Sequence, residues 1–144
     1  MTDLVELYRL AEGARIGVDR FPLGSVEALS LQDGSGRCHI ALDPAQLRGT
    51  ADEKRKLAHE LGHCATGSFY TRACRFELPG RCENRAEKWA IKKLVPKDEL
   101  CEAYLEGVTA AWELAERFGV PESFMRRVMA YYGPVADSGS GMDV

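Results

Sequence analysis

The sequence predicts an α+β fold in which a small antiparallel β-sheet packs on a long helix, followed by a C-terminal helical cluster. Three observations predict this arrangement. Two short apolar runs flank a turn-rich stretch, which indicates a β-hairpin. The pattern His-Glu-x-x-His lies in a segment with helical periodicity and a helix-start signal. Proline and glycine then divide the last third of the chain into short helical segments.

The N-terminal part of the chain is predicted to form one helix and the strands. Apolar residues at helical spacing predict a helix over 3–12 that ends at Gly13. Apolar runs at 26–31 and 38–42, separated by Asp-Gly-Ser-Gly, predict the hairpin. A further strand over 16–20 has a weaker signal.

The rest of the chain is predicted to be mainly helical. Residues 50–53, Thr-Ala-Asp-Glu, have the sequence of a capping box and open a helix that runs to Ala65. The stretch 66–81 has turn residues without periodicity, so we expect an ordered loop there. A helix over 83–95 then ends at Pro96. Three short helices are expected after it, at 97–105, 108–118 and 121–132.

Length and composition indicate one globular domain. The 144 residues suffice for a core without stabilising metals or disulfides, so we expect a single domain over 1–132 and a disordered Gly/Ser-rich tail over 133–144. A net charge of −3 does not indicate binding to nucleic acid. No apolar run is long enough to cross a membrane, and the N-terminal residues do not resemble a signal peptide. We therefore expect a cytoplasmic protein.

No two of the five cysteines form a Cys-x-x-Cys pair, which argues against a zinc ribbon and against a thioredoxin-type redox pair. In a reducing cytosol, free thiols are the expected state, several of them buried. Cys74 and Cys82 bracket a loop and could pair in an oxidising environment, an arrangement that we disfavour.

The segment LAHELGHCAT contains two histidines four residues apart, His59 and His63, with Glu60 after the first. On a helix, residues i and i+4 are about 40° apart around the axis, so both imidazoles can reach one ion. Glu60 can then contact a water molecule on that ion. The chain has only three histidines, and chance would produce this pattern in about one of a few hundred such chains. A metal site is therefore the favoured interpretation.

A hydrolytic zinc site also needs a third protein ligand. The extended pattern His-x-x-Gly-x-x-His is excluded, because Thr66 and Phe69 stand at the positions of its glycine and last histidine. The remaining histidine, His39, lies in the predicted hairpin, where a surface position is the simpler interpretation. The helix over 83–95 offers carboxylates instead.

Glu83 and Glu87 share one narrow helix face with Ala90 and Leu94. Two carboxylates in an apolar stripe are costly to bury unless a cation or hydrogen bonds offset that cost. Glu83 as a metal ligand, with Glu87 accepting a hydrogen bond from a ligand imidazole, would provide this compensation. The alternative is a solvated acidic face.

The segments HELGHCATGSFY and ENRAEKWAIKKLVP resemble the ImmA/IrrE-type metallopeptidases of phages and mobile elements, and the similarity covers roughly 26–132. The resemblance implies that His59, His63 and Glu83 bind Zn²⁺ and that Glu60 is the catalytic base. It also implies a protein substrate, namely a helix-turn-helix repressor of a phage or integrative element.

The chain departs from the family pattern at two positions. Glu87 stands where Asn or Asp is commoner, and Gly67 stands where many relatives carry a further histidine. A longer carboxylate can still hydrogen-bond a ligand imidazole. The residues themselves leave Mn and Fe open beside Zn²⁺.

In such a site the metal lowers the pKa of its bound water towards ~7, and Glu60 takes the proton as that water attacks the scissile carbonyl. Tyr70 and His39 are tentative candidates for stabilising the oxyanion, and Tyr104 is a weaker one. The strand over 38–42 could also offer its edge to an extended peptide.

The stretch 112–133 has the spacing of a helix-turn-helix and carries Arg126 and Arg127. Two arginines make a thin basic patch, so we favour a packing role and leave DNA contact open. Two alternatives to a peptidase remain: a non-catalytic, zinc-stabilised regulator that binds a protein or DNA, and a structural protein without metal.

Overall fold

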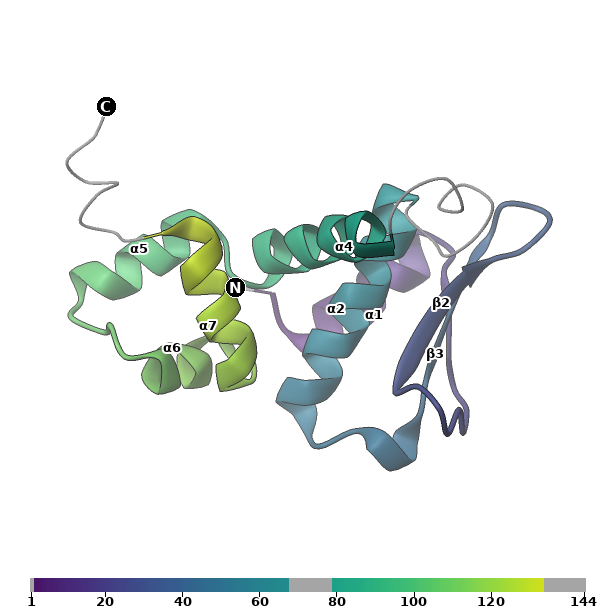
Figure 1. Cartoon of the computed structure of the whole chain (residues 1–144), viewed down its shortest axis with the longest axis horizontal. Helices are drawn as coiled ribbons and strands as arrows, with labels where there is room; N and C mark the ends of the chain where they lie inside the picture. The colour runs from purple at the N-terminus through teal and green to yellow at the C-terminus, as the bar shows by residue number, and fades with distance from the viewer. Residues whose placement is uncertain (1, 68–78, 134–144) are drawn as a thin grey trace.

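The computed structural model describes residues 2–67 and 79–133. The sheet lies along one side of the long helix α2, α1 and α4 pack beside this helix, and the short helices α5–α7 gather on the side away from the sheet (Figure 1). The predicted α+β class with a C-terminal helical cluster is confirmed. The elements are α1 (Leu4–Gly13), β1 (Gly17–Arg20), β2 (Ala28–Gln32), β3 (Cys38–Leu42), the 3-10 helix η1 (Pro44–Gln46), α2 (Thr50–Thr66), α4 (Pro79–Leu94), α5 (Lys97–Leu105), α6 (Ala111–Phe118) and α7 (Glu122–Tyr132).

Some expectations fall outside the described residues, namely most of the loop over 66–81 and all but the first residue of the tail over 133–144. The helix expected over 83–95 begins earlier than predicted, at Pro79. No helix in the described part of the chain is long and apolar enough to cross a membrane.

The sheet is mixed and not purely antiparallel as expected. Its strand order is β1-β3-β2, with β2 antiparallel and β1 parallel to β3. The chain passes from β1 to the opposite edge as β2, and then returns between the two as β3. The hairpin signal defines only the β2–β3 contact, so the direction of β1 was not readable from it.

This order also overturns the expectation that β3 offers an edge to a peptide. β3 is the central strand and is paired on both sides. Within the described residues, β2 pairs with β3 alone and is therefore the edge strand on the side away from β1.

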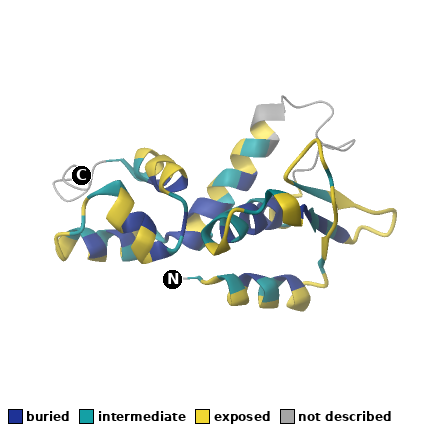
Figure 2. Ribbon diagram, turned by 90° about the horizontal axis from the view of Figure 1, so that it is seen from below, coloured by how far each residue is buried: buried dark blue, intermediate teal, exposed yellow. Residues whose placement is uncertain are grey.

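β3 packs one face on α2. Cys38, Ile40 and Leu42 are buried, whereas the alternate residues His39 and Ala41 are partly exposed, as the two-residue period of a strand requires. Buried residues line the inner sides of the helices and of the sheet (Figure 2).

The predicted capping box does not form at the start of α2. Gly49 is the N-cap residue and no side chain caps the helix. Asp52 instead accepts a hydrogen bond from the backbone N–H of Arg48 at 3.0 Å, and Glu53 binds the Tyr8 hydroxyl and the Arg20 guanidinium. Tertiary partners thus bind Glu53, the acidic side chain that the motif would use, whereas Asp52 makes a local contact at the start of the helix.

α2 and α4 approach very closely at Gly62. A Cβ atom at this position would lie 2.5 Å from the carbonyl oxygen of Ala86, which is closer than real contacts allow. Ala86 is itself fully buried. The small pair Gly62 and Ala86 therefore sets the separation of the two helices that carry the candidate ligands.

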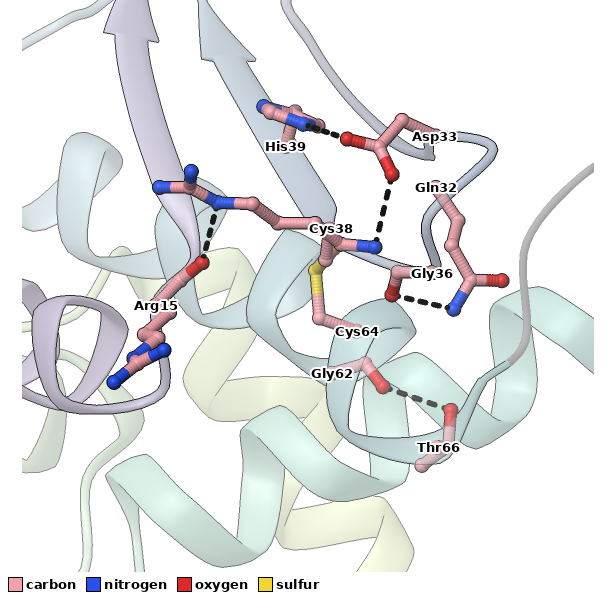
Figure 3. The surroundings of a disulfide bond; sticks show 10 residues. Arg15, Gln32, Asp33, Gly36, Cys38, His39, Gly62, Cys64 and Thr66 are labelled. Atoms are coloured by element: carbon pink, nitrogen blue, oxygen red, sulfur yellow. Dashed lines mark hydrogen bonds and ion pairs between the residues drawn. A yellow bond between two sulfur atoms is a disulfide. The ribbon is translucent and has the colours of Figure 1, made fainter.

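A disulfide joins Cys38 on β3 to Cys64 on α2, so the expectation of free thiols is wrong for these two residues (Figure 3). The sulfurs meet because β3 lies directly on the C-terminal part of α2, a proximity that spacing in the sequence cannot reveal. Cys101 is a free thiol. The disfavoured pairing of Cys74 with Cys82 falls outside the described side chains.

Removing this disulfide is expected to destabilise the fold. The bond spans a sequence separation of 26 residues, for which the loop-entropy model gives a stabilisation of about 3.5 kcal/mol. The double variant Cys38→Ser/Cys64→Ser should therefore unfold at a lower urea concentration than the oxidised wild type. Reductant should lower the wild-type midpoint and leave that of the double variant unchanged. A wild-type midpoint that does not respond to reductant would contradict the expectation.

The C-terminal helices are anchored to α2 and α4. The buried Lys54 ammonium on α2 donates to the carbonyl oxygen of Phe118 at 2.5 Å, at the C-terminal end of α6. The Tyr132 hydroxyl on α7 donates to the carbonyl oxygen of Val95 at 2.8 Å. These contacts fix the position of α7 relative to the helices that carry the histidines and the carboxylates.

Candidate metal centre

His59, His63 and Glu83 meet where α2 packs on α4. One ligand atom from each lies within 4.8 Å of the other two. Glu83 Oε1 is 3.1 Å from His59 Nε2, and Glu83 Oε2 is 2.8 Å from His63 Nε2. Both imidazoles thus point their Nε2 atoms at the carboxylate of Glu83. The i, i+4 spacing and the close approach at Gly62 together produce this convergence.

The two histidines differ in exposure. His63 is buried, and the His59 side chain is 18% exposed. Burial alone would lower the pKa of His59, but the hydrogen bond to Glu87 and the charges of Glu60, Glu83 and Glu87 outweigh it and raise the pKa. The surroundings are therefore strongly anionic and suit a cation.

Glu87 lies one turn beyond Glu83 and contacts the far side of His59. Its Oε1 is 3.0 Å from His59 Nδ1, so it can hold the ring with Nε2 facing Glu83. Burial would raise the pKa of Glu87, but hydrogen bonds from His59 and Arg127 lower it to about 2. Glu87 is therefore a carboxylate at neutral pH.

Glu60 is buried beside the two histidines. Burial is the main cause that raises its pKa, opposed by a hydrogen bond with Ser30 and by the charges of both histidines. Ser30 lies on β2 and pairs with Ile40, whose side chain faces α2, so its hydroxyl points towards the same helix. Ser30 on the edge strand is thus placed to hydrogen-bond the Glu60 carboxylate.

Replacing Ser30 by alanine is expected to impair any reaction that needs Glu60, without loss of metal. The buried carboxylate would lose a hydrogen bond that holds its orientation, and activity should fall several-fold. The measurement is the peptide cleavage rate together with the metal content. Ser123→Ala on the exposed side of α7 is the matched control. An unchanged rate in Ser30→Ala would show that this contact does not position Glu60.

A cleft of about 420 Å³ opens onto this cluster. It extends from the β1–β2 connection and the start of β2, across α2, to α4 and α7. Its lining residues are Ser25, Val26, Glu27, Ala28, Gln46, Arg55, Lys56, His59, Glu60, Glu83 and Arg127. Two of the three candidate metal ligands, His59 and Glu83, thus border a space that can admit a second molecule.

The expected oxyanion-stabilising residues are not brought to this cleft in the described structure. His39 hydrogen-bonds to Asp33 in the hairpin turn at 2.8 Å and lies against Gly17 of β1 (Figure 3). Tyr104 is half-buried on α5 and packs against the core. Tyr70 lies outside the described residues.

Several residues that shape the site are not among those that the sequence singled out. Ser30 carries no signal in the sequence, whereas Gly62 lacks a side chain and could have indicated a close approach of another backbone to this helix. Arg55 lies on the face of α2 that also carries His59, which i, i+4 spacing could have revealed. The segment with Arg127 is expected to have a packing role, with DNA contact left open, and the structure places Arg127 in the cleft.

The donor set fits a divalent transition metal. Two imidazole nitrogens and one carboxylate oxygen form a three-ligand set that leaves a coordination position for water or substrate. The hydrogen bond from His59 Nδ1 to Glu87 fixes the tautomer that a ligand with a free Nε2 requires. The residues present therefore suit such an ion on chemical grounds.

Comparison with known proteins agrees with this geometry. A family model described as the IrrE N-terminal-like domain, of the M78 peptidases, matches residues 40–129. No curated protein matches the chain at a significant level. The matched region begins within β3, ends within α7 and includes His59, His63 and Glu83, whereas the part of the cleft lining at 25–28 lies before it. The chain therefore belongs to the IrrE N-terminal-like family of peptidases, whose members are metallopeptidase-type domains.

Proposed function

We propose that this protein is a zinc-dependent peptidase, with His59, His63 and Glu83 as metal ligands and Glu60 as the general base. One observation carries the proposal: the three ligand atoms lie within 4.8 Å of one another, and Glu60 borders the same cleft as His59 and Glu83. A protein substrate follows from the peptidase family.

The proposed reaction is the addition of water to a peptide bond. A Zn²⁺ ion held by this ligand set would lower the pKa of a bound water and polarise the scissile carbonyl. Glu60 accepts a proton from the attacking water while the water oxygen bonds to the carbonyl carbon. Glu60 then delivers that proton to the amide nitrogen as the C–N bond breaks. The products are a new carboxylate and a new amine.

Burial suits Glu60 to this role. A carboxylate whose pKa is raised by desolvation is a stronger base than an exposed one and also returns its proton more readily near neutral pH. Ser30 holds it from the sheet, and the histidines flank it on α2. Glu87 orients His59 through Nδ1. Because Glu87 provides this contact, the Glu60 carboxylate can contact the reacting water.

We further propose that the natural substrate is a helix-turn-helix repressor of a phage or integrative element, as the family resemblance implies. The zinc-loaded protein should be incubated with purified repressors encoded beside its gene, and the products identified by intact mass spectrometry. A single cleavage that chelator prevents would support the proposal. Stable binding without cleavage would favour a non-catalytic regulator. The absence of both would remove the repressor as substrate.

A further inference from the structure

Two arginines from different helices converge beside the candidate metal centre. Arg55 on α2 and Arg127 on α7 both line the cleft that contains His59, Glu60 and Glu83. Arg127 is brought there by the packing of α7 on α2, where the Arg55 guanidinium lies 5.6 Å from the centre of the Phe124 ring. Phe124 precedes Arg127 by three residues, so the two lie on one face of α7.

The two guanidinium groups share a single carboxylate. Arg127 Nη1 is 3.1 Å and Arg55 Nη2 is 3.7 Å from Glu87 Oε2, while Glu87 Oε1 contacts His59. Within this group of three side chains, two positive charges face one negative charge, whereas the carboxylates of Glu60 and Glu83 in the same cleft act on His59. The other cation of the lining, Lys56, is already paired with Asp52 and Glu27.

Arg127 is accessible to a ligand. Its side chain is 63% exposed, and among the described residues Glu87 is its one hydrogen-bond partner, through Nη1. The neighbouring Arg126 is equally exposed, at 68%, but binds Glu122 on its own helix and does not line the cleft. The fork of Arg127 therefore has donors left for an incoming acceptor.

We propose that Arg127, supported by Arg55, forms a carboxylate-binding subsite that selects substrates with an acidic group next to the scissile bond. This inference rests on the proposed peptidase function and deepens it. Glu87 contacts both His59 and Arg127, so only this carboxylate separates the proposed subsite from a candidate metal ligand. A peptide that reaches the metal ligands therefore passes Arg127. The carboxylate belongs to an Asp or Glu side chain or to the end of the chain, and the test separates these two sources.

Binding is measured on the zinc-loaded Glu60→Gln variant, so that no probe is cleaved. The probes are three fluorescein-labelled pools of short peptides. One contains Asp or Glu and has an amidated C-terminus, the second replaces these residues by Asn or Gln, and the third is the second pool with a free C-terminal carboxylate. Fluorescence anisotropy gives the dissociation constant of each pool.

The first or the third pool, which carry a carboxylate, is expected to bind about tenfold more tightly than the second pool, which carries none. This difference corresponds to about 1.4 kcal/mol. Adding Arg127→Ala should remove this preference, and adding Arg126→Ala should leave it unchanged. Preference for the first pool assigns the subsite to acidic side chains, and preference for the third assigns it to a chain end. Equal binding of all pools, absence of binding, or a preference that survives Arg127→Ala would overturn the proposal.

Failure of the subsite and failure of the peptidase function remain distinguishable. An Arg127-dependent carboxylate preference together with a wild type that cleaves neither the pools nor the repressors would reject hydrolysis and keep the subsite. Cleavage without any carboxylate preference would keep hydrolysis and reject the subsite.

Discussion

Replacing Glu60 by glutamine is expected to reduce peptide cleavage by about 10²- to 10⁴-fold while the zinc content stays at about one ion per chain. Glutamine has nearly the same shape as glutamate but cannot accept the proton of the attacking water. The buried position of Glu60 means that solvent does not replace the missing base. The measurement combines single-turnover cleavage of the identified substrate with elemental analysis of the same samples.

Glu113→Gln on the exposed surface of α6 is the matched control and should cleave at the wild-type rate. Cleavage by Glu60→Gln at the wild-type rate would show that another group acts as the base. If the wild type and the variant bind the repressor equally and neither cleaves it, the protein is a non-catalytic regulator and the peptidase mechanism is wrong.

Replacing Glu83 by alanine is expected to remove zinc from the protein. Two imidazoles on one helix would then be the remaining ligands. The zinc affinity should fall by more than roughly 10- to 100-fold, which is the loss expected when a residue that hydrogen-bonds a metal ligand is removed. The comparison variant is therefore Glu87→Ala, whose loss should be the smaller of the two. Zinc content is measured after purification without chelator or added metal, and affinity by competition with a fluorescent chelator.

Glu102→Ala on the exposed side of α5 controls for the loss of one acidic residue and should keep its zinc. Zinc retained by Glu83→Ala would mean that another residue completes the ligand set. A wild type that contains no zinc and takes none up would reject the metal site, and with it the proposed function.

Local pattern was sufficient where a short segment carries the information. The helices over α1, α2 and α5 follow from apolar periodicity and from Gly13 and Pro96, and the hairpin follows from its turn. The convergence of His59 and His63 follows from helix geometry alone. Placing Glu83 opposite them required a second specific motif, because no property of one helix reveals which helix packs against it.

Local pattern failed where partners distant in the sequence decide. Glu53 of the predicted capping box binds α1 and β1 and caps no backbone N–H of α2. The strand expected over 16–20 pairs in the parallel direction with β3. Cys38 and Cys64 pair because β3 lies on α2. In each case the competing contact is tertiary and stabilises the fold more than the local preference does.

The sequence by itself determined the fold class, the helix that presents His59 and His63, and the carboxylate stripe of Glu83 and Glu87, because spacing along one helix fixes which side chains share a face. Only the tertiary structure decided the contact of Ser30 with Glu60 and the entry of Arg127 into the cleft. Both depend on how elements distant along the chain pack against α2, which is set by shape complementarity over the whole core and not by any local pattern.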